Sequence, residues 1–154
     1  MVDPSIRQAN VSDSAEIAAL CALLWPDSTP EEHRAEIEPL LKTRTCGSLP
    51  FTTFVSQDKN GRVTGFLQVD LRSHADGCDA TQPVGYVEGW FVLEEYRGLG
   101  IGAAMLRAAE EWARGLGCKE MASDTWIDER SSLKAHQALG FEVVDHCIHF
   151  RKAL

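Results

Sequence analysis

The chain has 154 residues, of which 44% are hydrophobic and 25% are charged, and its formal net charge at pH 7 is −8. This composition is typical of one globular domain that buries its core without disulfides or a structural metal. The negative charge argues against a nucleic-acid partner, because phosphates require a surface rich in Lys and Arg, and it favours a cationic substrate.

The sequence contains no pattern typical of a membrane span or a secretory leader. No apolar run approaches the roughly 20 residues of a membrane span, and the first four residues do not begin a basic region followed by an apolar core. We therefore expect a cytoplasmic protein with no membrane partner.

The five cysteines form no Cys-x-x-Cys pair, so the sequence predicts neither a disulfide framework nor a metal site.

The first third of the chain predicts a strand followed by two helices. The strand covers residues 5–10, and a helix begins near Asp13, which forms a capping-box pattern with Glu16. Pro26 ends this helix. Thr29, followed by a proline and an acidic turn, predicts a second helix over residues 30–42.

The rest of the chain predicts six further strands and two helices, in the order listed next. The predicted elements are an antiparallel hairpin of residues 51–56 and 62–71 around Asn60-Gly61, a loop over 72–83, a strand over 84–93, a helix over 100–115, a short strand over 119–123, a helix over 131–139, and closing strands over 141–144 and 147–152. The order of elements is that of a mixed α/β sheet.

Three alternating glycines join the strand at 84–93 to the helix at 100–115. Gly98, Gly100 and Gly102 let the backbone turn tightly, and the N-terminus of the helix adds partial positive charge, so the segment favours a pyrophosphate. A dinucleotide fold is excluded because its glycine loop follows the first strand, whereas about ninety residues precede this one. A nucleotide-triphosphate loop is excluded because Gly102 is followed by neither Lys nor Ser/Thr. An ordinary helix start is the remaining alternative.

The glycine run also has the order and spacing of a family signature. The segment Arg97-Gly98-Leu99-Gly100-Ile101-Gly102, placed after Trp90-Phe91-Val92-Leu93 and before Ala138-Leu139-Gly140-Phe141, resembles the acyl-CoA signature of the GNAT N-acetyltransferase superfamily. The resemblance implies an α/β fold with a mixed, mostly antiparallel sheet, flanked by helices and splayed at an acetyl-CoA groove. It also implies that residues 1–154 form a single GNAT domain.

Further local runs resemble one branch of that superfamily, the aminoglycoside 6'-N-acetyltransferases. These runs are Leu24-Trp25-Pro26, Gly77-Cys78-Asp79, Val87-Glu88-Gly89-Trp90-Phe91-Val92, Met121-Ala122-Ser123-Asp124-Thr125 and His136-Gln137-Ala138-Leu139-Gly140-Phe141-Glu142. They span nearly the whole chain. The resemblance implies acetyl-CoA as co-substrate, an aminoglycoside or other polycationic amine as acceptor, and a homodimer.

The resemblance also assigns residues to the acetyl-CoA site. The backbone around Trp90, Phe91 and Val92 would pair with the pantetheine arm in the manner of an added strand. The pyrophosphate would bind at Arg97, Gly98, Leu99, Gly100, Ile101, Gly102 and Ala103. Glu129 replaces the asparagine that is common at a further position of cofactor contact.

Three carboxylates are candidates for the acceptor site. Glu88 interrupts an apolar central strand, where burial without a partner costs several kcal/mol, so it either reaches a solvated rim or faces a substrate ammonium. Asp124 follows a strand, where capping is the alternative role, and Asp145 lies in a predicted turn that favours Asp on its own account. The resemblance places all three in the acceptor site, with Glu88 and Asp124 as catalytic candidates.

Three aromatic or imidazole side chains complete the candidate site. Trp25 ends a predicted helix, where it packs either on the core or on a sugar ring. His74 lies where some relatives carry a tyrosine next to the substrate. His136 stands where the superfamily commonly has a tyrosine that protonates the leaving thiolate; it either donates that proton or packs within its helix.

The function predicted from these residues is acetyl transfer from acetyl-CoA to the 6'-amine of an aminoglycoside antibiotic, by direct attack in a ternary complex, with antibiotic resistance as its result. An acidic acceptor site also suits a polyamine or another small amine. The alternative from a different class is a non-catalytic acyl-CoA-binding module that keeps the groove and lacks the chemistry.

Overall fold

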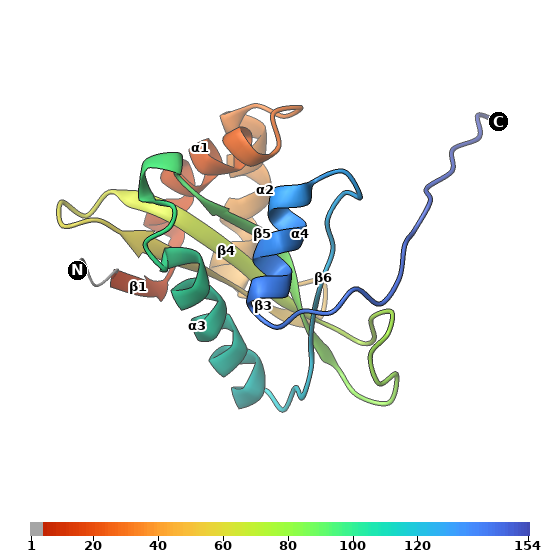
Figure 1. Cartoon of the computed structure of the whole chain (residues 1–154). Coiled ribbons are helices and arrows are strands. Elements are labelled where there is room, and N and C mark those ends of the chain that lie inside the picture. Colours follow the sequence, from red (N-terminus) through yellow and green to blue (C-terminus); the bar gives the residue numbers. More distant parts are fainter. Residues whose placement is uncertain (1–4) are drawn as a thin grey trace.

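A computed structural model describes residues 5–154 and contains one six-stranded sheet with helices on both faces (Figure 1). Antiparallel pairing joins the first four strands across the sheet, and the last strand is parallel to its neighbour. The order across the sheet is β1 (Ser5–Gln8), β3 (Leu49–Gln57), β4 (Val63–Arg72), β5 (Val84–Val92) and β6 (Met121–Ser123), with β2 (Thr45–Cys46) paired to β3. The mixed, mostly antiparallel sheet predicted from the sequence is confirmed.

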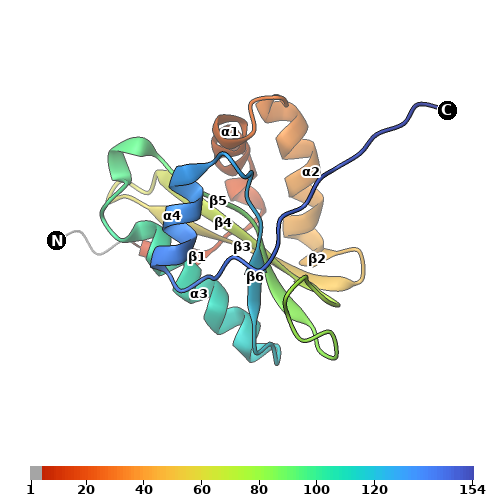
Figure 2. The same cartoon turned by 45° about the vertical axis from the view of Figure 1, so that its right-hand side comes forward.

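Two helices cover each face of the sheet (Figure 2). On one face lie α1 (Ser14–Leu24) and α2 (Pro30–Thr43); on the other lie α3 (Ile101–Gly115) and α4 (Arg130–Ala138). Short 3-10 helices, Val11–Asp13 and Glu94–Tyr96, precede α1 and α3. The four predicted helices therefore exist, and their ends differ from the prediction by one or two residues.

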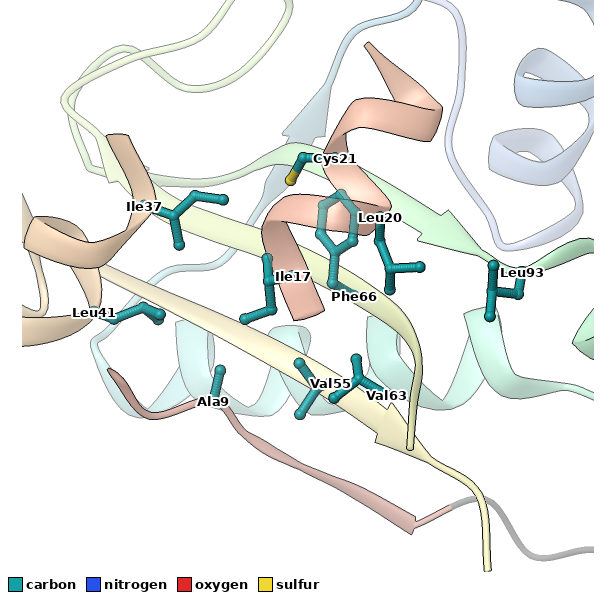
Figure 3. Close-up of a cluster of buried hydrophobic side chains, with 10 residues drawn as sticks. All are labelled: Ala9, Ile17, Leu20, Cys21, Ile37, Leu41, Val55, Val63, Phe66 and Leu93. Atoms are coloured by element: carbon teal, nitrogen blue, oxygen red, sulfur yellow. The ribbon is translucent and has the colours of Figure 1, made fainter. Parts of the chain in front are cut away.

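The core consists of two apolar layers separated by the sheet. Figure 3 shows the layer under α1 and α2, where Ile17, Leu20 and Ile37 pack against Phe66 of β4. The next residue along β4, Leu67, points to the opposite layer, because successive side chains of a strand face opposite sides. Both faces of β4 are thus buried, and the buried residues of this strand include the polar side chains of Thr64, Gln68 and Asp70.

The start of α2 follows the predicted capping chemistry. The Thr29 hydroxyl accepts a hydrogen bond from the Glu32 amide (3.2 Å), and the Glu32 carboxylate accepts one from the Thr29 amide (2.8 Å). Two amides that the helix leaves unpaired are satisfied in this way. Pro30, the first residue of α2, loses nothing there because its position needs no donor.

The capping box predicted for Asp13 and Glu16 is wrong. The Asp13 carboxylate binds the Arg7 guanidinium (2.7 Å) and the Asn10 amide, and the hydrogen bond from Arg7 lowers the pKa of Asp13. Glu16 instead accepts a hydrogen bond from the Val63 amide at the start of β4 (2.9 Å). The capping box that does form lies three residues earlier and pairs Asn10 with Asp13, whereas the partner of Glu16 is 47 residues away and could not be identified from local spacing.

The two closing strands predicted over residues 141–144 and 147–152 are also wrong for this chain. Residues 142–154, here called the C-terminal arm, extend away from the sheet in both views and pair with no strand of the described range (Figures 1 and 2). Ile148 is 77% exposed and Phe150 is 92% exposed. A strand forms only where a neighbouring edge satisfies its backbone groups, and the arm pairs with none of the strand edges within residues 5–154.

The lengths of the helices bear on the membrane question. No helix within residues 5–154 is long and apolar enough to cross a bilayer. Residues 1–4, which the sequence predicts not to begin a leader peptide, lie outside the described range.

Two leucines of α1 provide a test of the layer under this helix. Leu20 is 5% exposed, whereas Leu23 is 61% exposed on the same helix. We expect Leu20→Ala to lower the free energy of unfolding by about 2–5 kcal/mol, because a cavity is added to the lost transfer energy. Leu23→Ala should change it by about 0.5 kcal/mol or less. Urea denaturation at 25 °C measures both, and equal losses would contradict this packing.

Candidate functional site

The sheet opens between β5 and β6. These strands pair only at Gly85, Tyr86 and Val87 of β5, which face Met121–Ser123 of β6. Residues 88–92 of β5 continue without a partner strand on that side in the part of the chain that the structure describes. Their backbone groups on this edge are therefore available to an extended ligand.

Glu88 is an extra residue at the point where this unpaired edge begins. On the β4 side, Gln68 pairs with Gly89 and Val69 pairs with Val87, so Glu88 has no partner in the ladder. Such a bulge bends the strand and redirects the side chain. The bulge places the Glu88 carboxylate where the two strands separate.

Arg72, the last residue of β4, holds Glu88 in place. Its Nε and Nη2 atoms donate hydrogen bonds to Oε1 of Glu88 at 3.0 and 2.7 Å. The same guanidinium lies 3.4 Å from the centre of the Tyr86 ring. Arg72 therefore compensates the charge of Glu88, and neither side chain is fully buried.

A second carboxylate joins this network through Tyr86. The Tyr86 hydroxyl donates a hydrogen bond to Oδ2 of Asp124 (2.6 Å). Burial raises the pKa of Tyr86 above its usual value, and the bond to Asp124 raises it further, so the hydroxyl remains a donor at neutral pH. Glu88 and Asp124, both predicted from the sequence, are thus connected through two residues that the sequence analysis did not select.

Asp70 is a third carboxyl in the network and was also missed. It lies on β4 opposite Tyr86 and is only 7% exposed. Burial, the charge of Glu88 and a hydrogen bond with Glu88 raise its pKa to about 7, and Arg72 opposes this effect. An acid within an apolar run is the signal that identified Glu88, and it applies equally to Asp70. We call Asp70, Arg72, Tyr86, Glu88 and Asp124 the acidic cluster.

Trp25 forms a wall above the same part of the sheet. A Cβ atom on Gly89 would lie 2.5 Å from Cη2 of Trp25, so the indole rests directly on the β5 backbone. Trp25 also lines a cavity of about 360 Å³ together with Gln68 of β4, and His33 and Glu36 of α2. The indole is 37% exposed and therefore presents a surface to solvent as well as to the core.

The predicted phosphate loop adopts the conformation that its glycines permit. Gly98 and Gly100 have φ angles of 75° and 79°, which side-chain-bearing residues rarely adopt, and a Cβ on either would meet open space. No side chain of the described residues caps the N-terminus of α3, so its first amides are free to bind an anion. A Cβ on Gly102 would lie 3.2 Å from Trp90, so that indole packs against the first turn of α3. These residues fit a pyrophosphate.

Comparison with known proteins identifies the family. The profile of the Acetyltransferase (GNAT) family matches residues 17–141. The chain belongs to this family.

Curated relatives are similar to this chain over nearly its whole length. The aminoglycoside N(6')-acetyltransferase type 1 of Klebsiella aerogenes is 37% identical over 98% of this chain and 97% of its own length. The enzyme of the same name from Stenotrophomonas maltophilia is 35% identical over 98% and 94%.

Solved structures agree with this result. Aminoglycoside acetyltransferase AAC(6')-Iy, in complex with the bisubstrate analogue CoA-S-monomethyl-acetylneamine, is 33% identical, with a TM-score of 0.87 over 99% of this chain and 100% of the other. AAC(6')-Ih from Acinetobacter baumannii is 30% identical, with a TM-score of 0.85 over 98% and 99%. The predicted GNAT fold is confirmed.

His136 of this GNAT acetyltransferase is fixed by hydrogen bonds at both ring nitrogens. Nδ1 lies 2.7 Å from the Ser132 carbonyl, and Nε2 lies 2.8 Å from the Ser123 hydroxyl. A carbonyl only accepts, so Nδ1 carries the proton in the neutral ring and Nε2 accepts from Ser123. The ring also packs edge-on against Trp90 and Phe141. The arrangement orients His136 beside the unpaired edge of β5.

The remaining predicted residues lie apart from the acidic cluster. His74 is exposed in the loop after β4, where its ring nitrogen lies within hydrogen-bonding distance of the Ser73 hydroxyl. Glu129 precedes α4 and caps it with no side-chain bond among the described residues, and Asp145 lies on the C-terminal arm, where it accepts from the His146 amide. Within residues 5–154, none of the three shares a side-chain hydrogen bond or ion pair with the acidic cluster.

Proposed function

We propose that this protein transfers the acetyl group of acetyl-CoA to the 6'-amine of an aminoglycoside antibiotic and so confers resistance to it. The observation that supports this most strongly is the acidic cluster at the separation of β5 and β6, on the same strand as Trp90, which packs against the uncapped first turn of α3. The negative charge of the acidic cluster complements a polycationic acceptor, and the positive end of α3 complements an anionic co-substrate. The names of the relatives at 35–37% identity agree with this function.

We assign the co-substrate to the unpaired edge of β5 and to the loop before α3. Acetyl-CoA supplies the acetyl group as a thioester. The backbone of Trp90, Phe91 and Val92 would bind the pantetheine arm, and amides on this edge would also donate to the oxyanion that develops during transfer. The pyrophosphate is assigned to the loop residues predicted from the sequence, Arg97, Gly98, Leu99, Gly100, Ile101, Gly102 and Ala103.

The acceptor is assigned to the acidic cluster and to Trp25. Glu88 would receive a proton from the substrate ammonium, and Asp124 would bind a second ammonium of the sugar. The Trp25 indole, which rests on Gly89, offers an apolar face to a sugar ring. After the amine nitrogen bonds to the acetyl carbon it would lose its second proton to Nε2 of His136 through the Ser123 hydroxyl, and His136 would donate that proton to the sulfur as the C–S bond breaks.

Direct attack by the amine fits the cysteine chemistry of the chain. Burial raises the pKa of Cys21 to about 12, and burial also raises the pKa values of Cys78 and Cys118. These thiols are protonated at neutral pH and are poor nucleophiles. A ternary complex without an acetylated enzyme needs none of them.

The proposed function predicts dependence on one amine. Continuous detection of released thiol should show turnover of acetyl-CoA with aminoglycosides that carry a 6'-amine and none with matched compounds that carry a 6'-hydroxyl. A polyamine such as spermidine is the competing acceptor, because the acidic cluster suits any small polycation. Faster turnover of spermidine, or turnover that ignores the 6' position, would refute the proposed substrate.

Glu88 itself can be tested by removing only its charge. We expect Glu88→Gln to lower kcat/KM by about 100-fold, the scale of lost acid–base catalysis, and to weaken aminoglycoside binding. Coenzyme A affinity, measured by calorimetry, should stay within about twofold, since the loop before α3 is unchanged. The control is Glu111→Gln, which removes the same charge from an exposed position of α3. Full activity of Glu88→Gln would remove Glu88 from the mechanism.

We further propose that the protein acts as a homodimer joined by its C-terminal arm. Val144, Ile148 and Phe150 are all exposed and would lie on one face of the arm if it were extended as a strand, which is a pattern for pairing with a sheet edge. β6 pairs only with β5 and leaves its outer edge open in the described residues. A second copy would supply that edge to the arm.

The base of the arm is held in place. A Cβ on Gly77 would lie 2.5 Å from Cβ of Val144, so the arm leaves the body in contact with the loop between β4 and β5. Docking of the arm would order Asp145 next to this loop. We propose that Asp145 contributes to the acceptor site only in the dimer.

Charge on the apolar face of the arm should separate the two copies. Ile148→Asp is expected to convert a dimer into a monomer at micromolar concentration in analytical ultracentrifugation, because the buried strand cannot hold an unpaired carboxylate. Arg151→Asp places the same charge on the opposite face and should leave the dimer intact. A wild-type protein that sediments as a monomer would refute the dimer, as would a dimer that persists in Ile148→Asp.

A further inference from the structure

Asp70 carries a buried carboxyl to which the proposed reaction assigns no role. Its carboxyl is more than nine-tenths buried on β4, and its Oδ1 atom has no hydrogen-bond partner among residues 5–154. An unpaired buried carboxylate oxygen costs free energy, because the protein does not replace the water that it loses. A proton held between this carboxyl and a neighbour would remove that cost.

The neighbour that can share a proton with Asp70 is Glu88. Both hydrogen bonds from Arg72 end on Oε1 of Glu88, so its second oxygen is not used by Arg72. Asp70 lies opposite Tyr86 on the face of the sheet where Arg72 binds Glu88, and both the charge of Glu88 and hydrogen bonding between the two carboxyls raise the pKa of Asp70. One proton shared between the carboxyls removes their repulsion. Two adjacent carboxyls of this kind titrate as a pair.

The two carboxyls of this pair have different surroundings. Arg72 donates two hydrogen bonds to Glu88, whereas burial raises the pKa of Asp70 and so favours its protonated form. Glu88 is the more exposed of the two and lies where β5 and β6 separate. Access to the substrate and affinity for the proton are thus divided between two residues.

Other groups around Asp70 leave this assignment unchanged. Its cross-strand neighbours are Phe51 of β3, which is apolar, and Tyr86 of β5, whose hydroxyl donates to Asp124. On the helical side, His33 and Glu36 of α2 line the cavity beside Gln68, two residues before Asp70. Arg72 is the cation of the acidic cluster, and its hydrogen bonds go to Glu88.

We propose that Asp70 is a positioning residue that stores the proton which Glu88 accepts from the substrate ammonium. The N–H bond of the ammonium breaks and its electron pair stays on the nitrogen, which becomes the nucleophile. The proton moves to the Glu88 carboxylate and then across the hydrogen bond to Asp70, and water takes it up after the product leaves. This inference rests on the proposed acetyl transfer to an amine.

The test compares the pH dependence of three proteins. Asp70→Asn keeps the shape of the side chain but cannot bind or release a proton in this range. Thr53→Val is the matched control, because Thr53 is a fully buried residue of β3 with an unpartnered hydroxyl that does not titrate. The ionisation of the acceptor amine is common to all three proteins and cancels when kcat/KM of the wild type is divided by that of a variant.

For Asp70→Asn we expect this ratio to be near one at pH 5.5 and to rise tenfold or more by about pH 8.5, with its midpoint near 7. For Thr53→Val the ratio should not change with pH. A ratio for Asp70→Asn that stays constant from pH 5.5 to 8.5, at any level, overturns the proposal, because a purely structural role would give that result.

Thermal stability separates this effect from misfolding. The folded state binds the Asp70 proton more tightly than the unfolded state, so the wild type loses stability as pH rises from about 4 to about 7, and Asp70→Asn does not. The variant should therefore gain Tm relative to the wild type between pH 5 and pH 8. Lower activity with a higher Tm at pH 8 supports proton storage.

A direct titration keeps this inference distinct from the proposed function. Carbon-13 NMR of the aspartate and glutamate carboxyls should show an ionisation near pH 7 in the wild type and in Thr53→Val that is absent from Asp70→Asn. If no amine is acetylated, the proposed function fails, and the titration alone then decides whether the proton is shared. Absence of that ionisation from the wild type overturns the inference.

Discussion

One inserted residue in β5 determines the geometry of the site. Side chains on a strand alternate between faces, so Tyr86 and Gly89, three positions apart, would lie on opposite faces of a regular strand. Because Glu88 has no partner on β4, Tyr86 pairs with Asp70 and Gly89 with Gln68, and both face α1 and α2. The acidic cluster and the Trp25 wall therefore share one face of the sheet.

The acidic cluster stores electrostatic strain rather than stability. Asp70, Glu88 and Asp124 have Arg72 as the cation among them, and a well-packed apolar set in the same place would be as stable or more stable. The arrangement therefore agrees with the proposed binding of a polyammonium ligand, which would supply the positive charge that the acidic cluster needs.

Features encoded by nearby residues were predictable from the sequence. The cap at Thr29, the turn at Asn60-Gly61 and the glycine loop before α3 each depend on a few adjacent positions, and the structure contains all three. The contacts of Asp13 and Glu16 depend on residues of other elements. So does the network of Asp70, Arg72 and Tyr86, which requires the strand register and its irregularity. The closing strands failed for a different reason, since strand propensity does not specify whose edge is available.

The contact between Gly77 and Val144 fixes the point from which the arm departs, and this limits the geometry of any assembly. A segment that leaves the body from a fixed point can reach only surfaces near that point. A partner of the arm would therefore have to approach the side of the sheet that carries the loop between β4 and β5.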